Sequence, residues 1–168
     1  MAAADFDFMA WNHVQDSGGT WADALAEVER THPHWASHAA AYHEHFVASL
    51  VAEVPGSADL VRDLEAAGVP QWGLTNWSAE LFPHAPERFD VLTHLREVVV
   101  SGREQVAKPD PRIFAITVER SGLPAAELVF VDDRADNVEA AEAAGLQGVF
   151  FESAAQVRLV LREHGLPV

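Results

Sequence analysis

The chain has 168 residues, 49% of them hydrophobic, which suffices for one substantial core or a core with a small appendage. Its formal net charge of −15 disfavours nucleic acids and anionic membrane surfaces as partners, because both favour a basic protein face. There is no cysteine to form disulfides or thiolate sites, and no apolar run approaches the roughly 18 residues of a membrane helix, so we expect a soluble, cytoplasmic protein.

The first part of the chain, residues 1–52, predicts a small helical domain. It is rich in aromatic residues and histidines and has no strand-like pattern. Thr20 is a typical helix N-cap, and Asp23 follows in the first turn, where an acid is favourable. A second helix is expected between Pro33 and Leu50, with its aromatic residues facing inward.

From residue 53 onward the pattern changes to alternating helices and strands. A helix is expected to begin with Ser57 as N-cap and to end at Gly68, and another to begin at Pro111 and end at Gly122. The remaining helices are expected at 137–144 and 155–164, and the strands at 71–74, 98–101, 128–131 and 148–151. Such repeated units predict an α/β fold, a Rossmann-like parallel sheet with helices on both faces, over residues 53–168.

Polar groups follow two of these strands at the points where ligands of open α/β sheets bind. Thr75 and the backbone around Asn76 can donate hydrogen bonds to a phosphoryl oxygen, and Lys108 lies in a proline-flanked loop between the two strands. Asp132 and Asp133 end the later strand, and carboxylates of this kind dock Mg²⁺ together with a phosphate. The chemistry predicts a site for a phosphate and a divalent metal.

The same residues resemble the haloacid dehalogenase-like (HAD) hydrolase superfamily, in its capped, phosphatase-like branch. Leu74-Thr75-Asn76 matches the family's hydroxyl motif, Lys108 before a helix matches its lysine motif, and Val131-Asp132-Asp133 matches its acidic motif. The resemblance covers essentially the whole chain and implies that residues 1–52 form a helical cap. It assigns Thr75, Asn76 and Lys108 to the catalytic site.

For the metal, the resemblance implies Mg²⁺ held by Asp133, with Asp132 where many family members have glycine. Asn137 stands where many members carry an aspartate that supports the metal ligands.

The family's nucleophile, the first aspartate of an Asp-x-Asp motif after the central strand, has no convincing counterpart here. Asp5 and Asp7 have the right spacing, but Met1–Ala4 is not a strand pattern and Phe8-Met9 replaces the usual glycine turn. The first central strand and its nucleophile are therefore expected to be missing, with Asp5 or Asp7 as only a remote replacement.

The function implied is a Mg²⁺-dependent phosphatase of a small phosphorylated metabolite, acting through an aspartyl-phosphate and inactive in this chain as it stands. Dehalogenation fits less well, because the pair Asp132-Asp133 suits a metal that dehalogenases of this family do not use. The alternative is a non-catalytic, phosphate- or metabolite-binding regulatory protein. Strand edges left open by the missing strand also predict a homo-oligomer or a marginally stable chain.

Two further features have open interpretations. The histidines of the first domain include His34 and His38 at i, i+4 spacing, which suits zinc, but without an intervening metalloprotease-type glutamate we favour solvated side chains. Trp77, next to the hydroxyl motif, is a candidate for lining a substrate entrance.

Overall fold

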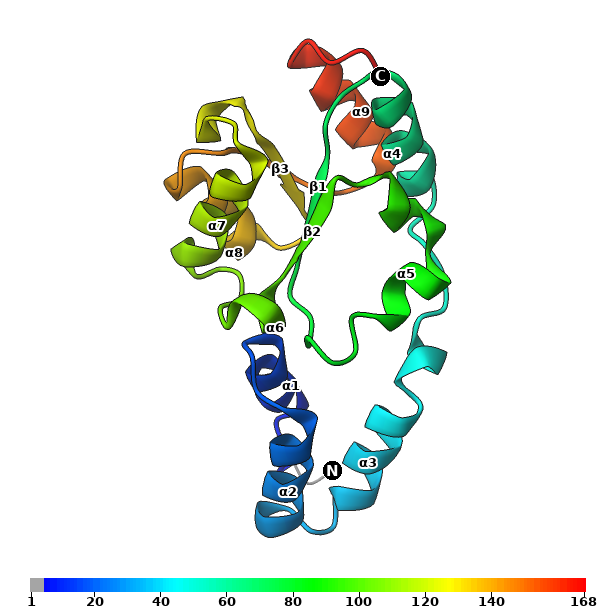
Figure 1. Cartoon of the computed structure of the whole chain (residues 1–168), viewed down its shortest axis with the longest axis vertical. Coiled ribbons are helices and arrows are strands. Elements are labelled where there is room, and N and C mark those ends of the chain that lie inside the picture. The colour runs from blue at the N-terminus through cyan, green and yellow to red at the C-terminus, as the bar shows by residue number, and fades with distance from the viewer. Residues whose placement is uncertain (1–4) are drawn as a thin grey trace.

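The computed structural model describes residues 5–168, so the expectation that Met1–Ala4 form no strand lies outside the described residues. The helices are α1 (Phe8–Asp16), α2 (Trp21–Thr31), α3 (Ala36–Glu44), α4 (Ser57–Ala66), α5 (His84–Arg88), α6 (Ser101–Glu104), α7 (Pro111–Ser121), α8 (Ala135–Ala143) and α9 (Ala154–Glu163), with 3₁₀ turns η1 (Phe46–Ser49), η2 (Asp90–His94) and η3 (Ala125–Glu127). The strands are β1 (Trp72–Thr75), β2 (Glu97–Val100), β3 (Val129–Asp132) and β4 (Gln147–Phe150). Figure 1 shows α1–α3 projecting from the strand-containing part of the molecule.

Residues 5–52, called the helical cap below, pack around an apolar cluster that also includes Leu81 from the loop after β1. The edge-to-face ring pair of Trp11 and Trp21 lies in this core, with ring centroids 5.3 Å apart, and Val28 and Ala39 pack beside it. Thr20 caps α2 by accepting a hydrogen bond from the Asp23 amide at 3.1 Å, as its position predicts. Helix α1 was not anticipated from the sequence.

The rest of the chain is an α/β layer structure in which strands lie between helices. On one side, Phe130 of β3 and Leu74 of β1 pack against the cluster that contains Ile113 and Phe114 of α7. On the other, Val129 and Val131 of β3 pack against α4 and α9. Helices therefore cover both faces, and the α/β expectation is confirmed.

In the structure, most of the predicted helices and strands begin and end within one or two residues of their predicted bounds. Each strand lies one residue away from its predicted range, so that Thr75 and Asp132 are the last residues of β1 and β3. Gly56, with φ of +79°, occupies the N-cap position of α4, and Ser57, the expected cap, is the first helical residue. Apolar pattern locates a strand, but backbone pairing determines where it ends.

The strands form two separate parallel pairs, β1 with β2 and β3 with β4. The Arg96 amide donates to the Gln71 carbonyl. Because the backbone groups of successive residues point in opposite directions along a parallel strand, those of Trp72 and Leu74 point away from β2. By the same alternation, the backbone groups of Val129 and Val131 point away from β4. Among residues 5–168, both β1 and β3 thus have one edge without a strand partner.

These open edges leave the two strands less covered than central parallel strands usually are. Every residue of β1 is only partly buried, and Phe130 is the one buried residue of β3. Within residues 5–168, no helix is long and apolar enough to cross a membrane.

The open edges predict association or low stability of the 168-residue chain. A buried unpaired amide or carbonyl costs about 1–3 kcal/mol, and pairing with another copy removes that cost. We expect light scattering after size-exclusion chromatography to detect oligomers that grow with protein concentration, or urea unfolding to be broad with an early midpoint. A concentration-independent monomer with one sharp unfolding transition would contradict this expectation.

Candidate active site

The centre of the candidate site is the buried ammonium group of Lys108, the chain's single lysine. Its Nζ donates to the Leu74 carbonyl oxygen at 2.9 Å and to Asp132 Oδ2 at 2.7 Å. The side chains of Lys108 and Asp132 are only 9% and 7% exposed. One cation therefore connects the carboxyl ends of β1 and β3, across the edges that share no backbone hydrogen bonds.

Asn76 holds the lysine loop in place. Its Nδ2 donates to the Lys108 carbonyl at 2.8 Å, and its Oδ1 accepts from the Lys108 amide at 2.8 Å. The side-chain nitrogen and oxygen of Asn76 therefore both bond the backbone of Lys108. Asn76 thus positions Lys108, and its side chain has little capacity left for a ligand.

The carboxylate of Asp132 is fully engaged within the protein. Besides Lys108, its Oδ1 accepts from the Arg134 amide at 3.0 Å and from Asn137 Nδ2 at 2.9 Å. Asn137 is only 2% exposed, and its Oδ1 is buried without a hydrogen-bond partner among the described residues. Asp132 therefore acts in this structure as the partner of Lys108.

Asp133, the expected metal ligand, is exposed at the start of the loop after β3. In the part of the chain that the structure describes, no three histidine, aspartate or glutamate side chains are arranged to hold a metal ion. With Asp132 engaged by Lys108, one exposed carboxylate is a poor fit to Mg²⁺, which dehydrates reluctantly. Residues 5–168 do not form a magnesium site by themselves.

Thr75 is the last residue of β1, directly after the carbonyl that Lys108 contacts. No hydrogen-bond partner for its hydroxyl is found among residues 5–168, so this hydroxyl is available to a ligand at the strand end.

The structure places Asp5 against His34 and Trp35 and Asp7 at the N-cap of α1, all within residues 5–52. Asp5 Oδ1 accepts from the Trp35 indole at 2.8 Å, and its carboxylate contacts the His34 ring at 3.0 Å. The Trp35 and His34 hydrogen bonds lower the pKa of Asp5. Asp7 is the N-cap of α1 and accepts from the Ala10 amide at 3.0 Å. Both have structural roles here.

The cap histidines form no metal cluster among the described residues. Several lie against aromatic rings instead: His43 is tilted on Trp21 with ring centroids 5.0 Å apart, and His38 meets Trp35 edge to face at 5.3 Å.

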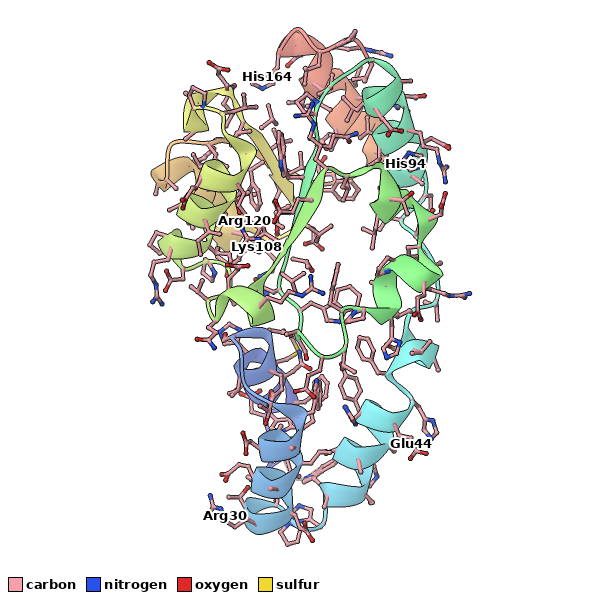
Figure 2. All side chains as sticks on the ribbon, viewed as in Figure 1. Arg30, Glu44, His94, Lys108, Arg120 and His164 are labelled. Atoms are coloured by element: carbon pink, nitrogen blue, oxygen red, sulfur yellow. The ribbon has the colours of Figure 1, made fainter. Side chains whose placement is uncertain are left out.

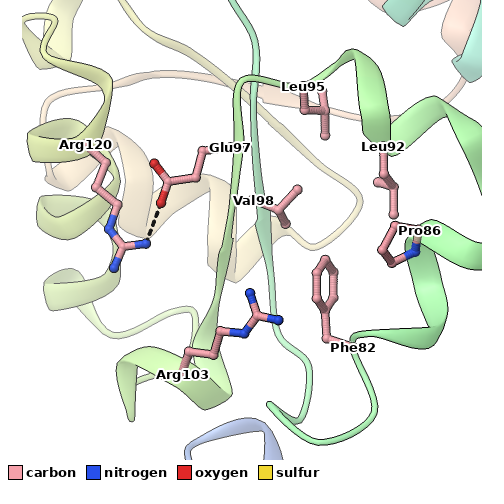
Figure 3. Close-up of a pocket in the computed structure, with 8 residues that line it drawn as sticks. All are labelled: Phe82, Pro86, Leu92, Leu95, Glu97, Val98, Arg103 and Arg120. Atoms are coloured by element: carbon pink, nitrogen blue, oxygen red, sulfur yellow. Dashed lines mark hydrogen bonds and ion pairs between the residues drawn. The ribbon is translucent and has the colours of Figure 1, made fainter.

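Two cavities flank the strands. The one in Figure 3, about 340 Å³, lies beyond β2, and its charged lining residues already have partners: Arg120 pairs with Glu97 at 2.6 Å, and Arg103 lies over the Phe82 ring. Figure 2 labels Lys108 beside the strands, outside that cavity's lining. A smaller cavity, about 230 Å³, is lined by Asn76 and by residues of the helical cap. Because Asn76 also holds the Lys108 loop, the smaller cavity adjoins the candidate site.

The parallel α/β fold thus brings a buried lysine and a threonine hydroxyl together at adjacent strand ends. The family model for haloacid dehalogenase-like hydrolases matches residues 3–145, and this chain belongs to that family.

Curated relatives agree with this membership. The chain is 30% identical to the sesquiterpene phosphatase astK of Aspergillus oryzae over 104 residues, which are 62% of this chain and 53% of that protein. It is 30% identical to the phosphoglycolate phosphatase of Escherichia coli K12 over 95 residues, 56% of this chain and 38% of that enzyme. The chain thus spans about half, or less, of the curated relatives it matches.

Solved structures show the same fold. A HAD family enzyme from Bacteroides thetaiotaomicron, solved as a magnesium complex, superposes with a TM-score of 0.72 at 19% identity, covering 92% of this chain and 81% of that one. A mutant of the same enzyme, in complex with magnesium and inorganic phosphate, gives a TM-score of 0.68 at 19% identity, over 87% and 77% of the chains.

The two hydrogen bonds of Asn76 make a prediction about stability. Replacing Asn76 by Ala removes both bonds and leaves backbone groups of Lys108 unpaired, so the free energy of unfolding should fall by about 1–3 kcal/mol. Asn76→Asp is the matched variant, because it keeps the acceptor and replaces the donor by a charged oxygen that faces the Lys108 carbonyl. Urea unfolding should rank wild type above Asn76→Asp and Asn76→Ala; unchanged midpoints would remove Asn76 from its positioning role.

The metal prediction follows from the poor fit of the carboxylates. Mg²⁺ should not saturate the 168-residue chain at micromolar concentration, because Asp133 offers one carboxylate and Asp132 is held by Lys108. Isothermal titration with MgCl₂ measures this directly, and Asp133→Asn serves as the blank. Tight, stoichiometric binding that Asp133→Asn abolishes would show that other residues complete the site.

Proposed function

We propose that this chain provides the phosphate-binding half of a phosphatase active site and acts on a small phosphorylated metabolite. The observation that carries the proposal is the buried Lys108 ammonium at the joined ends of β1 and β3. A phosphoryl oxygen placed there can accept hydrogen bonds from Nζ and from the Thr75 hydroxyl. Charge-assisted hydrogen bonds of this kind hold phosphate groups strongly.

The relatives support phosphate-ester chemistry over dehalogenation. Both curated relatives described above are named phosphatases. An L-2-haloacid dehalogenase also shares the fold, with a TM-score of 0.64, but at 15% identity it speaks for the fold alone.

We further propose that residues 5–168 bind phosphate without hydrolysing its esters. A phosphatase of this type needs a nucleophilic carboxylate beside the lysine. Asp132 is the carboxylate in contact with Lys108, and its two oxygens already accept three hydrogen bonds; Asp5 is bonded to Trp35 in the cap. The same observation favours a second candidate, a binding or regulatory protein that retains the pocket.

Two assays separate these candidates. The 168-residue chain and a version extended upstream, where the genomic reading frame encodes an apolar strand ending in Asp-x-Asp, are compared for Mg²⁺-stimulated hydrolysis of p-nitrophenyl phosphate. Activity of the extended version alone supports the phosphatase. An active 168-residue chain that Asp5→Asn inactivates would make Asp5 the nucleophile and overturn the proposal. Chloride release from a 2-haloacid without phosphate-ester hydrolysis would replace it with a dehalogenase.

Phosphate binding tests the site directly. Lys108→Ala should weaken binding of inorganic phosphate by about tenfold or more, since a charge-assisted hydrogen bond is worth on the order of 1.5–3 kcal/mol. Calorimetric titration measures it. Arg30→Ala is the charge-matched control, because Arg30 is exposed on α2 and pairs only with Glu27. Equal phosphate affinity of Lys108→Ala and wild type would remove Lys108 from the site.

The buried pair requires one more variant. Removing Lys108 alone leaves Asp132 as an uncompensated buried charge, which costs about 3–5 kcal/mol. In Lys108→Met/Asp132→Asn both charges are replaced, so this protein should remain folded by circular dichroism and still fail to bind phosphate.

A further inference from the structure

The smaller cavity, about 230 Å³, lies between the helical cap and the strand end that carries Asn76. Its cap-side lining includes Asn12 and Asp16 of α1, Trp21 of α2 and Tyr42 of α3. This volume is below the roughly 300–1,000 Å³ of pockets for drug-sized ligands, so the cavity suits a small chemical group.

Aromatic rings form one continuous wall of the cavity. The ring centroids of Trp21 and Tyr42 are 5.8 Å apart, those of Tyr42 and Phe46 are 6.0 Å apart, and those of Phe46 and Trp77 are 5.8 Å apart. The face of each ring carries partial negative charge, which attracts cations. The pairs Tyr42–Phe46 and Phe46–Trp77 meet edge to face, and a ring face that borders so small a volume attracts an ammonium group.

A carboxyl group lies in the same cavity. Asp16 Oδ2 accepts a hydrogen bond from Asn12 Nδ2 at 3.0 Å. Asp16 and Tyr42 line the same cavity. Burial raises the pKa of both groups, and the charge of Asp16 adds to the rise at Tyr42. Among the described residues no lysine or arginine forms an ion pair with Asp16, and His13 is the basic group close enough to affect it.

We propose that this cavity binds the ammonium group of an amine-bearing phosphomonoester, with the ammonium between Asp16 and the aromatic wall and the phosphate at Lys108. The substrate class follows from the proposed function, since the phosphate end rests on it. The ammonium site rests on the cavity alone.

A cation fits this cavity better than a neutral apolar group. A neutral ligand would bury Asp16 further without a counter-charge, which is costly for a carboxylate, whereas an ammonium group compensates it. The net charge of the chain, −15, acts in the same direction by attracting cations.

The test uses probes without phosphate. Choline chloride and its neutral isostere 3,3-dimethylbutan-1-ol are titrated into the 168-residue chain, followed by the NMR signals of the tryptophan indole N–H groups. Choline should bind on the order of tenfold more tightly than the alcohol and should shift the signals of Trp21 and Trp77. Equal binding of the two probes, or no choline binding, overturns the proposal, and neither comparison depends on a variant.

Variants then assign the contacts. Asp16→Asn keeps the shape and removes the charge, and Phe46→Leu keeps an apolar side chain and removes a ring; each should weaken choline binding at least about fivefold. Glu29→Gln removes an exposed acid from α2, outside the cavity, and should leave choline affinity unchanged. If Asp16→Asn and Glu29→Gln bind choline equally, the ammonium site is not at Asp16 and the proposal fails.

Phosphate titration keeps the two proposals distinguishable. Choline binding with no phosphate binding would sink the phosphatase proposal and support the ammonium site as a site in its own right. Phosphate binding through Lys108 with no preference for choline would support the phosphatase and overturn the ammonium site.

Discussion

The buried ion pair between Lys108 and Asp132 is the interaction on which the site depends. Removing two charges from water costs several kcal/mol per ion, and the pair is favourable only if other hydrogen bonds satisfy both groups. The Leu74 carbonyl does so for the lysine, and Asn137 and the Arg134 amide do so for the aspartate. The pair also connects β1 with β3, two strands that belong to separate sheets. The same contact that organises the site therefore also spans the break in the strand layer.

The break in the strand layer and the chemistry of the site are related. In a parallel sheet, neighbouring strands satisfy each other's backbone groups, and here a side-chain ammonium group contacts one carbonyl on the open edge of β1. Asn76 links the site to the helical cap, because its side chain anchors the lysine loop and also lines the aromatic cavity that cap residues share. Strand ends, loop and cap thus meet around a short stretch of chain, which explains how one small molecule could contact all three.

Local sequence signals predicted several of the helices and the approximate positions of the strands. Asp110 caps α7, Pro111 is its first residue and Gly122 ends it with φ of +68°, as their chemistry requires. Helix α1 escaped prediction because its N-cap, Asp7, belongs to an Asp-x-Asp spacing that suggested a different function. Asn12 and Asp16 were missed as cavity residues, although their i, i+4 spacing places them on one face of a helix if the helix is recognised.

The sequence by itself determined the family, the α/β class and the residue types of the proposed phosphate site, because strand-end motifs are local and their order along the chain is specific. Only the tertiary structure decided what each group does. Tertiary packing pairs Asp132 with Lys108 and leaves Asp133 exposed. It allows the Asn76 side chain to bond the backbone of Lys108, 32 positions away. It also forms a cavity from residues of α1, α2, α3 and the loop after β1. Hydrogen bonds and burial between distant segments depend on how helices and strands pack, and no local pattern contains that information.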